Sequence, residues 1–180
     1  MNTAINFFTN NGYITIEKIL AEKELQEIEH YLPEITIEKA GSRELLTKAW
    51  CRDLANKLKK HPKLNTLLPA NPMAIQCTLF KKSAGKNWLV PIHQDLSIPV
   101  RQHLDDIGYT GWAEKQGMIF VQPPAEVLEK IVAVRLHLDD CHLEHGPLRV
   151  VAGTHLTGRI PEKDWSTIRN QKGEQNCLVN

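Results

Sequence analysis

The spacing of hydrophobic residues divides the chain into a helical first part and a later part of short strands. A helix is predicted over Ala21–Tyr31, ending before Pro33, because its apolar residues recur at helical spacing: Leu20, Leu25, Ile28 and Leu32. A second helix is predicted over Arg43–Lys60, with an apolar stripe that is typical of a core-facing side: Leu46, Ala49, Trp50, Leu54 and Leu58. Before both, the alternating β-formers of Tyr13–Ile16 predict one early strand.

After Pro72 the pattern changes to short β-like runs separated by Gly, Pro, Asp and Asn. These runs are Met73–Phe80, Trp88–Ile92, Met118–Gln122, Ile131–Leu138 and Leu148–Val151. Only short helices, over Ala125–Glu129 and around Pro161–Arg169, interrupt them. Short strands with turn signals between them are typical of an antiparallel sandwich or jelly roll, not of alternating βαβ units. The predicted class is therefore α+β, mainly β.

Composition narrows the class of protein. A chain of 180 residues without repeats or long linkers predicts one domain over 1–180. The 22 basic and 21 acidic residues nearly cancel, which gives no reason to expect nucleic acid or a membrane surface as partner. There is no apolar run near the roughly 18 residues of a membrane span, and the N-terminus lacks the basic and apolar regions of a secretory leader. The scattered cysteines, without short paired spacings, are expected to be reduced and mostly buried thiols of a cytoplasmic protein: Cys51, Cys77, Cys141 and Cys177.

A histidine followed two residues later by an aspartate occurs three times, at His93/Asp95, His103/Asp105 and His137/Asp139. On a strand, residues i and i+2 point to the same face, so each pair could direct an imidazole and a carboxylate at one metal ion. Such a pair is two-thirds of the 2-His-1-carboxylate triad of non-haem Fe(II) oxygenases. The motif alone is weak, because common residues produce it by accident.

The surroundings of the three pairs differ. The charged stretch around His103/Asp105 predicts a solvated loop or helix. His137 and Asp139 share the polar face of a predicted strand with Arg135. This face is either a hydrated outer face or a row of side chains that lines a cavity. His93/Asp95 follows the apolar run WLVPI and precedes a polar turn, which suits a ligand pair at a strand end.

Three segments in order resemble the phytanoyl-CoA dioxygenase family. QCTLFKKSAGKNWLVPIHQDLSIPV looks like the region that holds the family's HxD motif, and HLEHGPLRVVAGTH resembles its later hairpin. The opening FFTNNGYITIEKILAEKELQEI is similar to the family's N-terminal strand and helix. The resemblance places the HxD motif on His93 and Asp95.

The resemblance implies a double-stranded β-helix, or jelly roll, with flanking N-terminal helices. It implies Fe(II) held by His93, Asp95 and a third ligand, and 2-oxoglutarate as cosubstrate, with Arg135 contacting the cosubstrate. The alternation of the predicted strand places His137 on the same face as Arg135, so we expect both to face the cavity that holds His93 and Asp95. The implied reaction consumes O2, converts 2-oxoglutarate to succinate and carbon dioxide, and hydroxylates an unactivated C–H bond of a small-molecule or acyl substrate. It further suggests that the segment Ser97–Pro124 covers the active site.

The chain also departs from the family pattern. Ala152 replaces the usual proline of the hairpin turn, and no histidine follows His155 to serve as the family's second histidine ligand. A basic anchor for 2-oxoglutarate beyond that ligand is also missing, so we expect a domain shortened by its last core strands, with little activity of its own. His142, His145 and His155 are alternative ligands.

The alternatives left open are a catalytically inactive jelly-roll module, acting in binding or without enzymatic role, and a zinc hydrolase on a cupin-like scaffold. Neither the substrate nor the oligomeric state, a homo-oligomer included, follows from the sequence.

Overall fold

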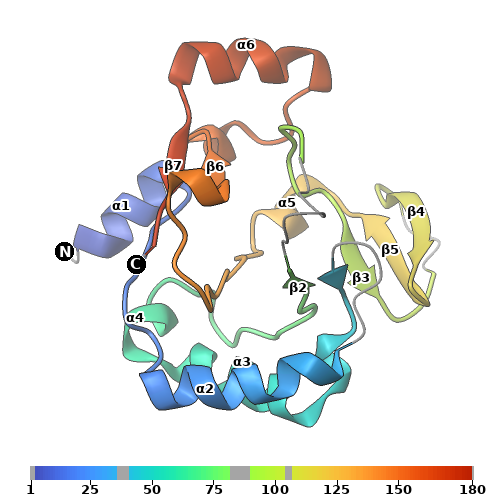
Figure 1. The fold of residues 1–180 in the computed structure, drawn as a ribbon. Coiled ribbons are helices and arrows are strands. Elements are labelled where there is room, and N and C mark those ends of the chain that lie inside the picture. The colour runs from blue at the N-terminus through green and yellow to red at the C-terminus, as the bar shows by residue number, and fades with distance from the viewer. Residues whose placement is uncertain (1–2, 36–40, 82–89, 104–106, 180) are drawn as a thin grey trace. The chain divides into compact units, whose positions relative to one another are not determined.

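The structure is a computed structural model that describes residues 3–35, 41–81, 90–103 and 107–179. Its α-helices are α1 (Thr3–Asn11), α2 (Glu22–Tyr31), α3 (Ala49–Lys60), α4 (Pro62–Asn65), α5 (Ala125–Leu128) and α6 (Glu162–Lys172). Its strands are β1 (Gly41–Ser42), β2 (Leu79–Phe80), β3 (Ile98–Val100), β4 (Thr110–Lys115), β5 (Met118–Gln122), β6 (Leu148–Val150) and β7 (Gln175–Cys177), as drawn in Figure 1. Single 3-10 turns lie at Leu32–Glu34, Leu45–Thr47, Leu143–His145 and Thr154–Thr157.

The chain divides into two compact units. One unit contains Met1–Tyr31, Ile92–Gln94 and Val132–Asn180, and the other contains Leu32–Pro91 and Asp95–Ile131. One of the boundaries between the two units falls between Gln94 and Asp95. A single domain over 1–180 stays a prediction.

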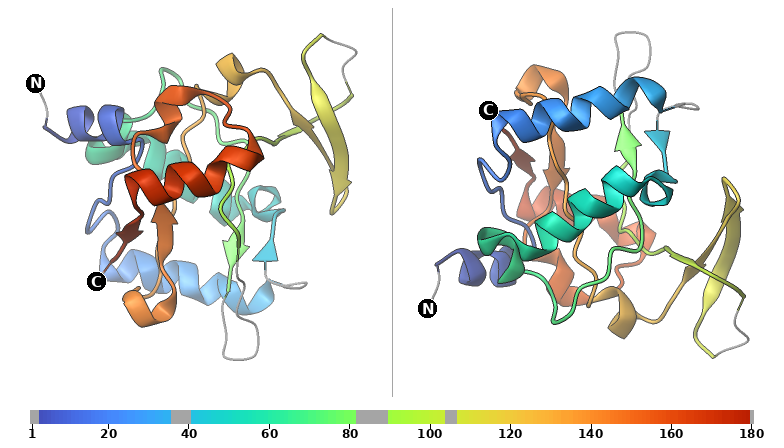
Figure 2. Two further views of the ribbon diagram at one scale, coloured as in Figure 1. Left: turned by 90° about the horizontal axis from the view of Figure 1, so that it is seen from above. Right: turned by 90° about the horizontal axis from the view of Figure 1, so that it is seen from below.

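The first unit contains α1, α2, α6 and the antiparallel pair β6–β7. The backbone of Ala21 donates to a carboxylate oxygen of Glu24 at 2.6 Å, which caps the start of α2. Figure 2 shows β6 and β7 side by side in both views. Among the described residues of this unit, the buried apolar ones are Ile28 of α2 and Ile160, which precedes α6.

The second unit contains α3, α4, α5, the two-stranded β1–β2 sheet and a three-stranded sheet in the order β3-β5-β4. β4 and β5 are joined by the two-residue turn Gln116-Gly117, both with positive φ, which suits the twist of a tight hairpin. Pro99 in β3 is tolerated because β3 is an edge strand of this sheet. Among the residues described in this unit, the buried core contains Leu45, Cys51, Leu64, Phe120 and Val121, together with Pro123.

The predicted helices are largely confirmed, with two corrections, whereas α1 and α4 were not predicted. α2 agrees with the prediction to one residue, but α3 begins at Ala49 and not at Arg43, because a 3-10 turn over Leu45–Thr47 precedes it. Ala49 of the predicted apolar stripe is exposed, whereas Cys51 is the deepest residue of the helix, at 2% exposed.

The strands were predicted less well. Met118–Gln122 is confirmed as β5, and Leu148–Val151 corresponds to β6. Tyr13–Ile16 and Ile131–Leu138 are not strands, because neither segment pairs with a neighbour in a ladder. Of the strand predicted over Met73–Phe80, the structure contains only β2 and a single bridge at Cys77. Of the strand predicted over Trp88–Ile92, Trp88 and Leu89 lie outside the described residues.

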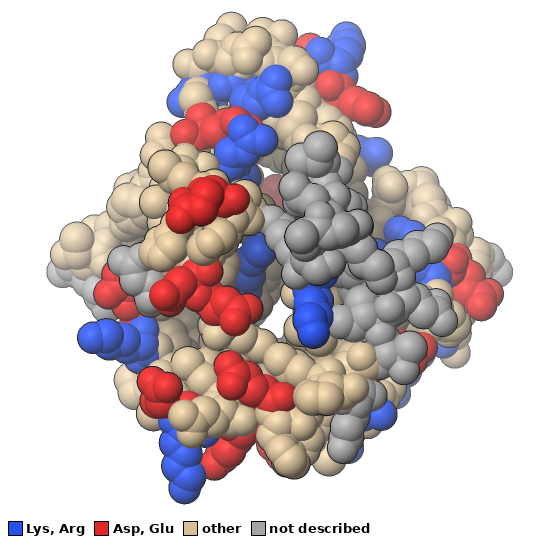
Figure 3. All heavy atoms as spheres, viewed as in Figure 1, with Lys and Arg blue, Asp and Glu red and all other residues tan. Residues whose placement is uncertain are grey.

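The chain is therefore mixed α and β, with its described strands in three small antiparallel sheets. Closure of these strands into a jelly roll stays a prediction. Within the described ranges, no helix combines the length and the apolar character that crossing a membrane requires. Figure 3 shows acidic and basic side chains mixed on the viewed face, and helix α6 is one element that carries both kinds.

Candidate metal and cosubstrate residues

The HxD segment is irregular backbone between Val90 and Ser97. His93 and Asp95 are exposed, and Gln94 between them is half-buried. Alternation of this kind is typical of an extended chain, in which neighbouring side chains face opposite sides. An imidazole and a carboxylate at the surface are accessible to an ion without any opening of the core.

Gln94 connects this segment to a distant loop of the same unit. Its side-chain Nε2 donates to the carbonyl of Gly158 at 3.0 Å, and its Oε1 accepts from the backbone N–H of Ile160 at 2.7 Å. Sequence reasoning missed this residue. The glutamine carries no local signal, since its partners lie more than sixty positions away in the chain.

Arg135 and His137 lie in the irregular segment that was predicted to be a strand. Arg135 is exposed and His137 is half-buried. The expected alternation fails in part, because Val134, placed on the apolar face by the pattern, is 47% exposed. Burial, followed by the positive charge of Arg135, lowers the pKa of His137 below its ordinary value of 6.5. At neutral pH this imidazole is therefore neutral, the form that binds metals and accepts hydrogen bonds.

Cys177 of β7 belongs to the same neighbourhood. Burial raises the pKa of its thiol above the ordinary value, while the charge of Arg135 acts in the opposite direction. The guanidinium of Arg135 thus acts electrostatically on both His137 and Cys177, which lie far apart in the sequence. The sequence suggested a buried thiol at Cys177 but gave no signal for its proximity to Arg135.

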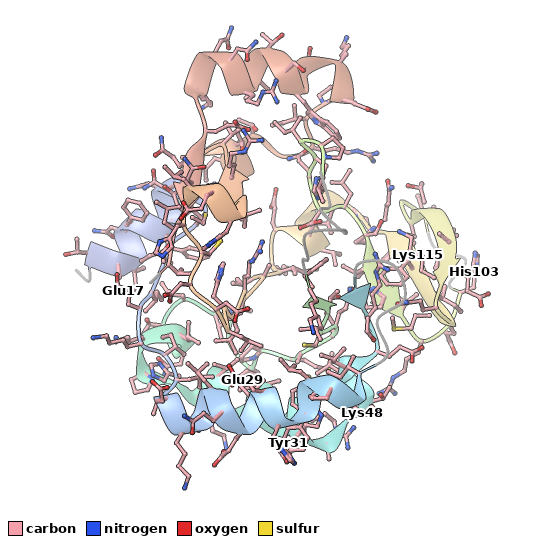
Figure 4. The ribbon with its side chains drawn as sticks, viewed as in Figure 1. Glu17, Glu29, Tyr31, Lys48, His103 and Lys115 are labelled. Atoms are coloured by element: carbon pink, nitrogen blue, oxygen red, sulfur yellow. The ribbon has the colours of Figure 1, made fainter. Side chains whose placement is uncertain are left out.

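The described residues of the other candidate pairs include His103 and Asp139, and both lie at the surface. His103 is exposed in a loop, as predicted, and its ring contacts the Trp112 ring with centroids 3.9 Å apart. His103 and Lys115 are labelled near β4 in Figure 4. Asp105 lies outside the described residues, and Asp139 is exposed.

The segment Ser97–Pro124 forms the β3-β5-β4 sheet. Val121, which belongs to the segment that the resemblance places over the active site, is fully buried within β5, and Pro123 after that strand is buried too. Trp112 is half-buried. Val121 and Pro123 therefore serve the core of the second unit.

The three alternative histidine ligands each have a contact with another residue of the protein that is unrelated to a metal. The backbone N–H of His142 donates to Nδ1 of His145 at 3.2 Å, and both residues are exposed, as predicted. His155 Nε2 lies 2.9 Å from the carbonyl oxygen of Thr9, to which it donates. Among the residues that the structure describes, no group of three or more His, Cys, Asp or Glu is gathered closely enough to hold a metal ion.

The family model described as Phytanoyl-CoA dioxygenase (PhyH) matches residues 8–177. The chain belongs to the phytanoyl-CoA dioxygenase family. The family points to oxygenase chemistry that uses Fe(II) and 2-oxoglutarate, and to a small-molecule substrate and O2. The resemblance read from the three sequence segments is therefore confirmed. Neither the search of curated proteins nor that of solved structures returned a significant match.

Proposed function

We propose that this chain is an Fe(II)- and 2-oxoglutarate-dependent dioxygenase that hydroxylates an unactivated C–H bond of a small-molecule or acyl substrate. The observation that carries the proposal is the family match over residues 8–177, which includes the HxD motif of His93 and Asp95. In this proposal the two side chains are ligands of the iron.

His93 and Asp95 supply two of the three protein donors that such a metal takes, and the described residues gather no group of three. Neutral imidazole and carboxylate are the donors of the facial triad that leaves coordination positions open for a cosubstrate and oxygen. His93 and Asp95 are both exposed, so neither must leave a packed core to reach an ion. When bound, the iron would activate O2, which is the oxidant of the C–H bond, and 2-oxoglutarate would supply the other two electrons that the reduction of O2 requires.

Arg135 is proposed to bind a carboxylate of 2-oxoglutarate. The planar guanidinium presents a fork of N–H donors that matches a carboxylate, and the bond is charge-assisted. The exposed side chain of Arg135 is accessible to a dissolved dicarboxylate. His137, kept neutral by its lowered pKa, adds a hydrogen-bonding group beside this charge without adding a second positive one.

The function is tested by Fe(II)-dependent formation of succinate from 2-oxoglutarate, measured with the chain and with His93→Ala and Asp95→Ala. Equilibrium titration should show Fe(II) binding in the parent and its loss in both variants. Succinate formation by the parent, which we expect to be low, should be lost together with the binding. His103→Ala is the matched control, because it removes an exposed histidine of another HxD pair.

Two outcomes contradict the proposal. Absence of both Fe(II) binding and succinate formation in the parent chain identifies the inactive jelly-roll module instead. Zinc-dependent hydrolysis that needs no 2-oxoglutarate identifies the hydrolase.

A further inference from the structure

We propose that Gln94 is a positioning residue for the metal site: its side chain holds the backbone between His93 and Asp95 against the loop of residues 158–160. The inference rests on the proposed function, since it concerns the same two ligands. It assigns a role to a residue that contacts no reacting group.

The clamp consists of two hydrogen bonds from one side chain. The amide of Gln94 donates to the Gly158 carbonyl at 3.0 Å and accepts from the Ile160 N–H at 2.7 Å. Both bonds are partly buried. A side-chain amide is suited to this task because it offers a donor and an acceptor a fixed distance apart.

The loop that receives the amide is itself anchored. Ile160 is buried at 9% exposure, and its carbonyl accepts from the Trp165 indole Nε1–H of α6 at 2.9 Å. The backbone of Ile160 is thus bonded on one side to α6 and on the other to Gln94. Gly158 has φ +66 and ψ −147, a conformation that essentially only glycine adopts without strain.

The HxD segment needs such an anchor. Residues 90–97 are irregular and lie outside the strand ladders, so the sheet hydrogen bonds that usually fix a strand do not fix them. A metal ion binds more tightly to ligands that are already held in place, because less freedom is lost on binding. The proposed ligands His93 and Asp95 are exposed on either side of Gln94, whereas the half-buried side chain of Gln94 is directed to the loop of residues 158–160.

The test is titration of the chain with Co(II), a spectroscopic substitute for Fe(II), comparing the parent with Gln94→Met. Methionine keeps the length of the side chain and removes both hydrogen bonds. Residues that support metal ligands from outside typically change metal affinity about 10–100-fold, so we expect Co(II) affinity to fall by that factor and the visible absorption bands to shift. The matched control is Gln76→Met, which removes a half-buried glutamine bonded to Thr78 in the other unit and should leave both readouts unchanged.

A second variant acts on the other end of the clamp. Gly158→Ala strains the backbone that presents the carbonyl to Gln94, and it causes no crowding, since a Cβ there meets nothing within 4 Å. It should lower Co(II) affinity in the same direction as Gln94→Met.

Ile28→Ala is the control for an effect of lower stability on Co(II) affinity, because it removes apolar side-chain atoms from the core of the same unit. This variant should lower the urea midpoint while leaving Co(II) affinity and spectrum as in the parent under folding conditions. Gln94→Met overturns the inference if its affinity and spectrum equal those of the parent or change no more than those of Ile28→Ala. If the His93→Ala variant binds Co(II) as tightly as the parent does, the proposed function itself fails, whatever the result for Gln94→Met.

Discussion

The imidazole of His155 packs directly against Gly12, so that a Cβ atom on residue 12 would lie 2.8 Å from His155 Cγ. The ring also donates from Nε2 to the carbonyl of Thr9 at 2.9 Å, and the backbone N–H of Gly153 donates to the Asn11 carbonyl at 2.9 Å. The turn after β6 is therefore fixed to the end of α1. His155, one of the alternative metal ligands, has a structural contact of its own.

Gly12→Ala should destabilise the fold strongly. Gly12 has φ +77, which costs a non-glycine residue about 1–3 kcal/mol, and the added methyl group collides with His155 at a further cost of about 1–3 kcal/mol. Urea unfolding should show a loss of about 2–6 kcal/mol.

The control for this prediction is Gly173→Ala. Gly173 has φ +75, but a Cβ there meets nothing within 4 Å, so only the backbone strain applies. The double variant Gly12→Ala/His155→Ala should recover the part of the loss that is due to the collision. Equal losses for Gly12→Ala and Gly173→Ala would contradict a steric role of His155.

The sequence was sufficient for elements whose signal is local. The apolar period and Pro33 determine α2, and the β-rich run of Met118–Gln122 determines β5. β4 was missed although the adjacent Gln116-Gly117 is a hairpin turn signal, because its Thr-Gly-Trp-Ala-Glu-Lys sequence is weak in β-formers. Ile131–Leu138 failed for the opposite reason. Its residues favour a strand, but a strand also requires a partner, which composition does not reveal.

The candidate site likewise includes residues that a local sequence signal reveals and residues that it does not. His93 and Asp95 were found because the motif is contiguous, and the family match then gave it a context. Gln94 and Cys177 carry no local signal, because they interact with residues that are distant in the sequence: Gly158 and Ile160 for Gln94, and Arg135 for Cys177.

Arg135→Met should weaken 2-oxoglutarate binding more than Fe(II) binding. Loss of a hydrogen bond to a charged group costs about 1.5–3 kcal/mol, which corresponds to about 10–100-fold in affinity. Isothermal titration of the metal-loaded chain with 2-oxoglutarate measures the effect. Arg149→Met is the matched control, since Arg149 is an exposed arginine engaged with Glu174 at 2.8 Å. If the Arg135 and Arg149 variants bind 2-oxoglutarate equally well, the assignment of Arg135 is wrong.

His137 should make the fold less stable as the pH falls. Its pKa in the folded chain lies below the ordinary 6.5, so the unfolded chain takes up the proton first. The contribution is present above pH 6.5 and is lost as the pH falls through the lower folded pKa. Urea midpoints should therefore decline more steeply from pH 7.5 to 5.5 in the parent than in His137→Gln.

The cause of this shift can be separated by NMR titration of the His137 ring. Arg135→Met should raise the pKa of His137, but not to its ordinary value, because burial is the larger cause and remains. An unchanged His137 pKa in Arg135→Met would show that the two side chains do not interact.

Cys51 and Cys77 should titrate as a pair, with Cys77 the first to lose its proton. Cys51 lies in the first turn of α3 and is 2% exposed, and Cys77 is held nearby by the bridge between its backbone and that of Glu44. A hydrogen bond between the two thiols, together with burial, raises the pKa of Cys51 well above its ordinary 9.0, and the same bond lowers the pKa of Cys77. Because the thiolate is the reactive form, Cys77 should react with iodoacetamide at a lower pH than Cys51.

Cys51→Ala tests this pairing, because it removes the hydrogen bond that stabilises the Cys77 thiolate and leaves burial, which opposes it. The midpoint of the alkylation rate of Cys77 against pH, followed by mass spectrometry, should therefore move upward. The pH of this midpoint decides the test, and not the rate itself, because a small cavity left by alanine accelerates alkylation at every pH without changing the midpoint. Cys141→Ala removes a half-buried thiol of the other unit and should leave the midpoint in place. A midpoint that stays fixed or falls in Cys51→Ala would mean that Cys51 does not donate to Cys77.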